Sequence, residues 1–275
     1  MPDTRRATVA AVQMTCQLGD KRANLQKAAA LLSGINAPVD IACLPELFST
    51  GYNLDVLDEA LFDLAELIPG ETTEALGRLA RERNLALIAS IAERDAQVED
   101  IIYDTAVIFS RSGKLLGRYR KTHLYPVENR FFRAGNALPV INVDGLRVGV
   151  AICFEHAFPQ IFTTLALRGA QVVFNPSAVP RGFGYLQDVR IPARAQDNQI
   201  FVVAVNHVGA EGQVTYCGRS QIADPRGEVI SVASDDVEDV VSADLDLDLI
   251  RNQRRQEPIF RGFRPELYEP QMSGK

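Results

Sequence analysis

The feature that most constrains the fold is the number of short apolar segments of strand length. About a dozen of them alternate along the chain with roughly five or six segments whose apolar residues recur at helical spacing. That number of strands is too large for one simple doubly wound sheet, whereas two sheets packed face to face accommodate it. The sequence therefore predicts an α/β fold with two packed mixed sheets and helices on the outside.

The segments can be placed along the chain from their periodicity and from the turn residues between them. The hairpin turn at Ser112-Gly113 predicts antiparallel neighbours in part of a sheet. Asp20 is expected to cap the first helix, and Pro192 to kink the helix around it or mark its start. The expected helices are 21–35, 71–84, 158–166 and 185–198, and the expected strands are 7–14, 39–44, 85–93, 101–110, 114–121, 146–153, 170–177, 199–206, 218–225 and 228–234.

The composition limits the classes of function. The 275 residues carry a net charge of -6, so neither nucleic acid nor an anionic membrane is expected as a partner. The chain contains no run of about 18 apolar residues, so no transmembrane helix is expected. The four cysteines lack metal-ligand spacing, and no export signal is recognisable, so we expect free thiols in a cytoplasmic protein. We expect one domain over 1–275, with about 255–275 as a C-terminal arm.

Three reactive side chains share one setting, because each follows an apolar strand. Glu46 comes after VDIACLP, Lys121 follows KLLGRYR, and Cys153 closes LRVGVAIC. The ends of strands are where α/β folds usually build their sites. Each residue alone also fits a structural role: a core thiol for Cys153, and an exposed charge for Glu46 or Lys121.

The neighbours of these residues sharpen the chemical interpretation. A helix is expected soon after Cys153, so a strand–turn–helix would present the thiol at an exposed corner. The helix N-terminus would also favour the thiolate. Glu46 has apolar neighbours, which are expected to raise its pKa toward that of a working base. Glu128, in an aromatic-rich loop, is expected to orient Lys121 or a bound amine.

A thiol, a carboxylate and an ammonium together fit the cleavage of a carbon–nitrogen bond. The thiolate attacks a carbonyl or nitrile carbon, the carboxylate takes the thiol proton, and the ammonium stabilises the oxyanion. Water then cleaves the thioester. The scheme requires no metal and no cofactor.

Three segments around these residues resemble the signatures of the nitrilase (carbon–nitrogen hydrolase) superfamily. They are PELFSTGY, YRKTHLYPVENRFFRAG and GVAICFEHAFPQIFTTLALRGAQVVFNPSA, in the order and spacing of that family. The resemblance extends from AAVQM to GRSQIADPRGEVI, which is most of the chain. It implies a four-layer αββα sandwich, a homodimer or larger homo-oligomer, and a catalytic triad of Glu46, Lys121 and Cys153.

The same resemblance implies two supporting groups and some limits on the substrate. Glu128 matches a second family glutamate, and the backbone N–H of Phe154 would complete the oxyanion hole. Phe154 stands where true nitrilases often carry Trp, and no Arg follows Cys153 as it does in branches that hydrolyse N-carbamoyl amino acids. Glu155 would repel a carboxylate and tolerate a neutral or cationic group, or else it binds backbone groups at a helix start.

We expect the substrate pocket to be lined by Tyr52, Glu155, Arg181 and Tyr185, while His207 either lines it or is buried in the core. The sequence thus predicts a cysteine amidase that acts on small amides or N-carbamoyl amines and releases ammonia. A nitrilase that converts a nitrile to acid and ammonia is the near alternative. A catalytically idle interaction module is the alternative of another class, and acyl transfer to an amine instead of water stays open.

Overall fold

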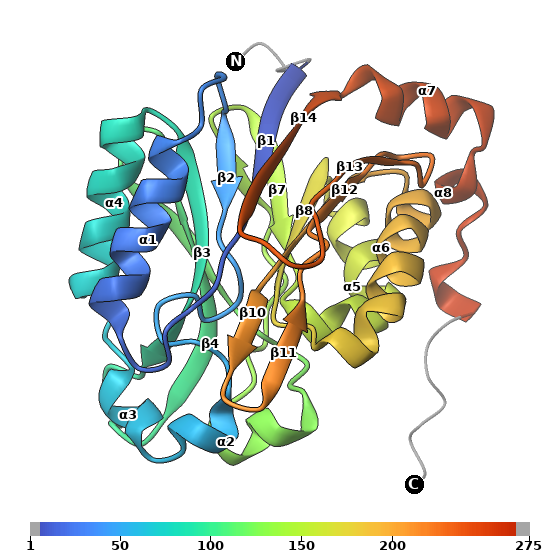
Figure 1. Ribbon diagram of the computed structural model, residues 1–275. Helices are drawn as coiled ribbons and strands as arrows, with labels where there is room; N and C mark the ends of the chain where they lie inside the picture. Colours follow the sequence, from blue (N-terminus) through green and yellow to red (C-terminus); the bar gives the residue numbers. More distant parts are fainter. Residues whose placement is uncertain (1–5, 268–275) are drawn as a thin grey trace, which may run out of the picture.

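Two six-stranded mixed sheets lie face to face in the computed structural model, which describes residues 6–267 (Figure 1). The first sheet has the strand order β14-β1-β2-β3-β4-β5. Its central strands β1, β2 and β3 are parallel, and the other three are antiparallel to their neighbours. The strands are β1 (Arg6–Gln13), β2 (Ile41–Cys43), β3 (Ala86–Arg94), β4 (Ile102–Phe109), β5 (Leu115–Arg120) and β14 (Asp239–Asp246).

The second sheet repeats this arrangement with the order β13-β12-β9-β8-β7-β6. Here β7, β8 and β9 are parallel, and the outer strands are antiparallel to their neighbours. A separate hairpin, β10 (Val208–Glu211) with β11 (Val214–Cys217), follows β9. The strands of the sheet are β6 (Ile141–Val143), β7 (Leu146–Val150), β8 (Val172–Ser177), β9 (Phe201–Asn206), β12 (Gln221–Ala223) and β13 (Val229–Val232).

The main core fills the space between the sheets. Along β1, Val9 and Ala11 belong to this core, whereas Ala10 and Val12 belong to the cluster under the helices. That alternation is the period of a strand whose two faces are both buried. Phe174 of the second sheet lies in the same central core as Val9, so the two sheets share one apolar interior.

Helices cover the outer face of each sheet. Side chains of α1 and α4 pack on the first sheet, and those of α5 and α6 pack on the second. The predicted four-layer αββα sandwich is therefore confirmed (Figure 1). The helices are α1 (Lys21–Ser33), α2 (Leu54–Leu57), α3 (Ala60–Leu64), α4 (Glu71–Arg83), α5 (Pro159–Leu167), α6 (Gly184–Asn198), α7 (Asp248–Gln256) and α8 (Ile259–Gly262), with short 3-10 helices at η1 (Pro126–Arg130), η2 (Cys153–Ala157), η3 (Arg181–Phe183) and η4 (Pro265–Leu267).

The cap predicted at Asp20 for α1 is correct, and one of the two roles expected of Pro192 is wrong. Asp20 caps α1, and its Oδ1 accepts a hydrogen bond from the Ala23 N–H at 2.9 Å. Pro192 lies inside α6, which begins at Gly184, so the idea that Pro192 marks the helix start is wrong. The apolar residues of α6 that pack on the sheet extend to both sides of the proline, which keeps the segment helical despite the missing N–H.

The sequence prediction missed some strands and overextended another. β14 was not expected, because its acidic residues alternate with small apolar ones at the edge of the sheet and hide the pattern. The hairpin β10–β11 and the short β6 were also missed. The strand expected over 218–225 is shortened to β12, because Gly218 and Arg219 both have positive φ angles that end the extended backbone.

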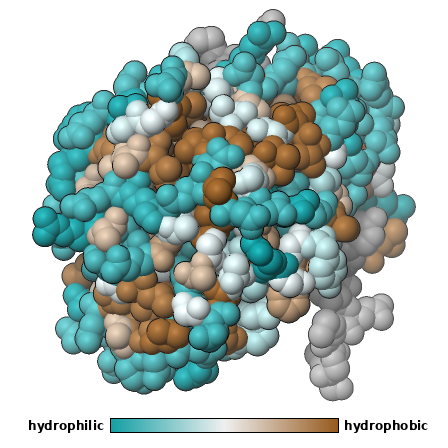
Figure 2. Space-filling view, viewed as in Figure 1, coloured by the Kyte–Doolittle hydropathy of each residue, from teal (hydrophilic) through white to brown (hydrophobic). Residues whose placement is uncertain are grey.

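The C-terminal part of the chain continues along the surface as α7, α8 and η4, and residues 268–275 of the expected arm lie outside the described residues. Between residues 6 and 267, no helix has the length and apolar character needed to cross a membrane. All four cysteines are free, as predicted. Figure 2 shows hydrophilic side chains around separate hydrophobic patches, the mixture expected where a protein surface meets water.

Candidate active site

Glu46 lies in the loop that follows β2, and its side chain is completely buried. The next residue, Leu47, has a φ of 47° and donates its N–H to Ser90 Oγ at 3.0 Å, which fixes the turn. Burial raises the pKa of Glu46, and the positive charge of Lys121 offsets only part of that rise. The direction agrees with the sequence prediction and suits a group that must accept a proton.

Lys121 directly follows β5, and its ammonium lies between two carboxylates. Lys121 Nζ is 2.6 Å from Glu46 Oε1 and 2.6 Å from Glu128 Oε1, and all three side chains are fully buried. Burial lowers the pKa of Lys121, but the charges of Glu128 and Glu46 outweigh burial and raise it well above its ordinary value. The lysine therefore stays a cation, and an exposed surface role is excluded.

Asp104 on β4 is a member of this group that the sequence prediction missed. Its Oδ2 is 3.8 Å from Lys121 Nζ, and its Oδ1 accepts a hydrogen bond from Ser90 Oγ at 2.5 Å. Burial and the charge of Glu46 raise the pKa of Asp104 well above its usual range, which favours the neutral acid. The available signal was a carboxylate inside the apolar run IYDTAVIF, since such a residue is buried only with partners.

Glu128 sits in η1 and connects the lysine to the pocket. Its Oε1 accepts hydrogen bonds from Lys121 Nζ and from the Tyr52 hydroxyl, and its Oε2 accepts one from the Tyr125 N–H at 2.8 Å. The side chain is fully buried. Glu128 is thus oriented by three donors, and it shares the Lys121 ammonium with Glu46.

Cys153 lies where β7 turns into η2. It has a φ of 45°, a conformation that is costly for a residue with a Cβ and is typical of functional turns. Asn175 on β8 supports the turn, since its Nδ2 donates to the carbonyls of Ala151 at 2.6 Å and Cys153 at 3.3 Å. The side chain is 7% exposed and faces a cavity, so the thiol is buried without being sealed.

The thiol is not activated in the way that the sequence suggested. The segment directly after Cys153 is the short η2, and α5 begins at Pro159 with Phe158 as its N-cap, so the first α-helical turn follows the thiol by several residues. Burial raises the pKa of Cys153 well above its usual value, and the charge of Glu46 adds to the rise while Lys121 opposes it. The resting group is therefore a thiol, and a base must remove its proton during attack.

The cavity beside Cys153 has a volume of about 170 Å³. Its walls are mostly aromatic and aliphatic, and include Tyr52, Tyr125, Phe154, Phe183, Val179 and Leu186. Two polar side chains, His156 and Arg190, complete the lining, and the sequence prediction named neither of them for the pocket. Tyr52 is the expected lining residue that the structure places here.

Glu155 does not line the cavity, in contrast to the expectation. It is fully buried, and its oxygens accept hydrogen bonds from the Thr122 N–H at 2.8 Å and the Ile152 N–H at 2.6 Å. The Tyr119 hydroxyl donates to the same carboxylate at 2.7 Å. Glu155 therefore joins the backbone next to Lys121 to the backbone next to Cys153, which is the alternative role of binding backbone groups.

Arg181 and Tyr185 also lie outside the cavity lining. Arg181 forms an ion pair with Asp236, and Tyr185 is 63% exposed. Both residues are close in sequence to Phe183 and Leu186, which do line the cavity. Sequence proximity alone could not show which of these neighbouring side chains line the cavity.

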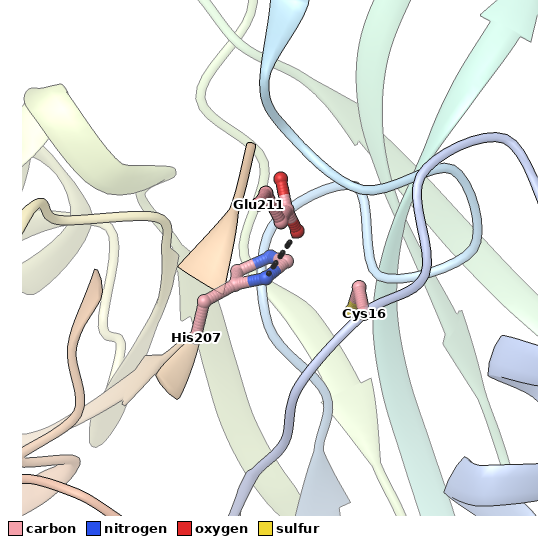
Figure 3. A group of neighbouring side chains, drawn as sticks. All are labelled: Cys16, His207 and Glu211. Atoms are coloured by element: carbon pink, nitrogen blue, oxygen red, sulfur yellow. Dashed lines mark ion pairs between the residues drawn. The ribbon is translucent and has the colours of Figure 1, made fainter. Parts of the chain in front are cut away.

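A buried ion pair, drawn in Figure 3, contacts the loop that carries Glu46 and Tyr52. His207 contacts the Glu46 carbonyl through Nε2, and its Nδ1 is 3.3 Å from Glu211 Oε1. Glu211 Oε2 accepts hydrogen bonds from the N–H groups of Tyr52 and Asn53, each at 2.9 Å. His207 is therefore a core residue that does not line the pocket, and together with Glu211 it holds the loop at both ends.

Between residues 6 and 267, two groups of side chains have the donor atoms that metals bind. Cys16 lies beside the His207–Glu211 pair, and the ligand atoms of the three are within 4.8 Å of one another (Figure 3). The ion pair and the backbone contacts already account for His207 and Glu211. The second group is formed by Glu46, Asp104 and Glu128, and there Lys121 Nζ contacts all three carboxylates.

Comparison with known proteins agrees with this geometry. The family model described as carbon-nitrogen hydrolase matches residues 8–255 of the chain. The chain belongs to the carbon–nitrogen hydrolase family. Within the superfamily, it is 37% identical to a protein named nitrilase from Pyrococcus abyssi over 94% of this chain and 98% of the relative. It is 33% identical to omega-amidase NIT2 of Xenopus tropicalis over 90% of this chain and 92% of the relative.

A solved carbon–nitrogen hydrolase structure extends the likeness to three dimensions. The amidase of Nesterenkonia sp. AN1, solved after Michael addition of acrylamide at its active-site cysteine, superposes with a TM-score of 0.78 and 25% sequence identity. The match covers 91% of this chain and 97% of the amidase. The relatives of this carbon–nitrogen hydrolase therefore include proteins named for both amide and nitrile hydrolysis.

The His207–Glu211 pair gives a prediction about stability. Glu211→Gln keeps the shape of the side chain but leaves the charge of His207 without its buried partner, so the free energy of unfolding should fall by about 3 kcal/mol. Denaturant unfolding measures this change. Glu228→Gln is the control, because Glu228 pairs with Arg226 at the surface, where its side chain is 62% exposed, and the change should be below about 1 kcal/mol. Equal losses in the two variants would contradict the assigned role.

Proposed function

We propose that this carbon–nitrogen hydrolase is an amidase that cleaves small amides or N-carbamoyl amines and releases ammonia. The observation that carries the proposal is the buried chain Glu46–Lys121–Glu128, in which Glu128 bonds to Tyr52 on the wall of a small apolar cavity that Cys153 also lines. The charges of Glu46 and Lys121 act on the Cys153 thiol, so the four groups form one electrostatic unit. Amidases among the relatives support the same reaction class.

In the proposed mechanism, Glu46 takes the proton of Cys153 as the sulfur attacks the amide carbon. The raised pKa of Glu46 makes it a competent base for a thiol whose own pKa is raised by burial. The negative charge that develops on the substrate oxygen is stabilised by the Lys121 ammonium and by the backbone N–H of Phe154. Glu46 then gives the proton to the leaving nitrogen, so ammonia departs and a thioester stays on Cys153.

Water completes the turnover. Glu46, again a carboxylate, takes a proton from water as the oxygen attacks the thioester carbon, and the thiol is regenerated as the acid leaves. Lys121 does not donate a proton in this scheme, because its raised pKa keeps it charged throughout. Glu128 and Asp104 hold the ammonium in place, which keeps the oxyanion site ready before the substrate binds.

Nitrile hydrolysis is the second candidate, and the relative from Pyrococcus abyssi named nitrilase favours it. The same cysteine would attack the nitrile carbon. The test is ammonia release from matched pairs, an amide and the nitrile with the same carbon skeleton, together with simple N-carbamoyl amines. Faster release from amides than from nitriles is the expected result, and release from nitriles alone would reject the amidase proposal.

A catalytically idle interaction module is the remaining alternative, and the reactivity of the thiols separates it from an enzyme. An amidase should be alkylated stoichiometrically at Cys153 near neutral pH, and a bound amide should block the reaction. An idle protein should be labelled slowly and evenly across Cys16, Cys43, Cys153 and Cys217. The homo-oligomer, the cytoplasmic location and the single domain over 1–275 stay predictions from the sequence.

The proposed roles predict the effects of three substitutions. Cys153→Ala should abolish turnover without unfolding the protein, because alanine fits the space of the thiol. Lys121→Ala and Glu46→Gln should each reduce kcat by about a hundredfold or more, as expected for loss of an oxyanion donor or a base. Steady-state assays of ammonia release measure the rates, and circular dichroism checks the fold. A near-normal rate in any folded variant would reject the role of that residue.

The raised pKa of Glu46 predicts the acid side of the pH profile. Glu46 must be ionised to act as base, so kcat/KM should fall as the pH drops through its pKa, at a pH above the ordinary glutamate value of about 4.3. The midpoint is measured from the pH dependence of kcat/KM for a stable amide substrate. The folding of the enzyme is monitored at each pH. A midpoint at or below the ordinary value would show that the ionisation of Glu46 does not limit the reaction.

A further inference from the structure

The buried group around Lys121 contains more carboxyl groups than its one ammonium can balance. Glu46, Asp104 and Glu128 each place an oxygen within 4.8 Å of the other two, and Lys121 Nζ contacts all three. The four side chains are fully buried. If all three carboxyl groups were ionised, two negative charges would stay uncompensated away from water, which is costly. At least one of the three therefore holds a proton.

Two carboxyl oxygens of this group mark the place of that proton. Within residues 6–267, Glu46 Oε2 and Asp104 Oδ2 are buried, and neither accepts a hydrogen bond from a surrounding donor. The other oxygen of each group does have a donor, since Glu46 Oε1 accepts from Lys121 Nζ and Asp104 Oδ1 accepts from Ser90 Oγ. Two neighbouring carboxylates repel each other, whereas an acid and a carboxylate form a short, strong hydrogen bond. One proton between the two oxygens gives both of them a partner.

Asp104 is the better of the two places for the proton. Glu46 Oε1 accepts a charge-assisted hydrogen bond from Lys121 Nζ at 2.6 Å, whereas Asp104 Oδ2 is 3.8 Å from the same nitrogen. The ammonium therefore stabilises the carboxylate form of Glu46 more strongly. Burial raises the pKa of both groups. The charge of Glu46 adds to the rise at Asp104, while Lys121 and a hydrogen bond with Asp104 oppose the rise at Glu46.

The hydrogen bonds on the other side of Asp104 complete a closed ring. The Leu47 N–H donates to Ser90 Oγ at 3.0 Å, and Ser90 Oγ donates to Asp104 Oδ1 at 2.5 Å. Because Oδ1 is used as an acceptor, the proton of the acid is left to Oδ2, which faces the free oxygen of Glu46. Leu47 is the next residue after Glu46, so the ring returns to the residue where it starts. It fixes both the backbone turn and the carboxylate.

We propose that Asp104 is a protonated positioning residue, which donates a hydrogen bond to Glu46 Oε2 and holds the proposed base in its carboxylate form. The inference rests on the proposed function and adds a residue to it. Lys121 binds one oxygen of Glu46 and Asp104 binds the other, so the carboxylate has one fixed orientation. Asp104 is not among the residues that line the cavity, and it therefore acts through Glu46.

The presence of the proton can be tested without turnover. Infrared spectra of the wild-type protein and of Asp104→Asn are recorded near neutral pH, in H2O and in D2O. The difference spectrum should contain the C=O band of one protonated carboxyl group, which shifts in D2O. Absence of this band from the wild-type protein would overturn the proposal. The band also separates this inference from the proposed function, because it reports the proton even if the protein hydrolyses no amide.

The pH profile of kcat/KM tests the role of the hydrogen bond. A donor to the carboxylate lowers the pKa of Glu46, so its loss in Asp104→Ala should raise the acid midpoint by about one pH unit and reduce kcat by about tenfold. Asp104→Asn offers an amide N–H to the same oxygen. It should therefore keep the midpoint near that of the wild type and lose less of kcat than Asp104→Ala. The titratable groups around the Asp104–Glu46 pair include Lys121, Glu128, Cys153, Tyr52 and Tyr216.

Two other outcomes would overturn the proposal. If Asp104 were an ionised carboxylate, removal of its charge would lower the acid midpoint in both variants. If Asp104 only supported the fold, both variants would lose rate or stability at an unmoved midpoint. Asp63→Asn, at an exposed aspartate of α3, is the control and should change neither the rate nor the midpoint. Circular dichroism checks the fold, and if Asp104→Ala does not fold, Asp104→Asn and the infrared band decide.

Discussion

The arrangement depends on one buried positive charge. An ammonium removed from water costs several kcal/mol unless carboxylates replace its hydration, and Lys121 contacts Glu46 and Glu128 at 2.6 Å each. The carboxylates raise the pKa of the lysine and keep it charged, while burial raises the pKa of Glu46 and makes it a better base. The buried ion pair between Lys121 and Glu46 therefore stabilises the lysine charge. It also keeps Lys121 a cation while Glu46 stays a better base.

The site exists because two sheets meet. Glu46 and Lys121 follow strands of the first sheet, and Cys153 follows a strand of the second. Two buried contacts tie the halves together at this point: Glu155 bonds to the backbone beside Lys121 and beside Cys153, and His207 contacts the Glu46 carbonyl. The site is therefore as rigid as the interface between the sheets, which suits a reaction that depends on preorganised charges.

In the proposed site, one set of residues contacts the substrate along the cavity walls and another set takes part in the reaction. In the proposed mechanism the ion-pair chain around Lys121 acts at the reacting atoms, whereas the cavity walls are apolar except for His156 and Arg190. Apolar walls exclude water and limit the size of the molecule that fits. In a family whose members are named for nitrile and for amide hydrolysis, variation of such wall residues can change the substrate while the reacting groups stay.

The sequence by itself determined the layer architecture and marked the three residues that we propose to react. Strand and helix periods are local, and Glu46, Lys121 and Cys153 each end an apolar strand, so the pattern marks them without knowledge of the fold. Asp104 was missed because its carboxylate lies inside a strand, where only the cross-strand neighbours Ser90 and Lys121 explain it.

Only the tertiary structure decided which side chains line the cavity. Glu155, Arg181 and Tyr185 are close in sequence to lining residues but are not part of the lining, while Arg190 lines the cavity from the same helix as Leu186. The direction of a side chain on a turn or helix depends on what the element packs against, and so do the burial and charge that set each pKa. These quantities arise from contacts between segments far apart in the chain, and no local pattern encodes them.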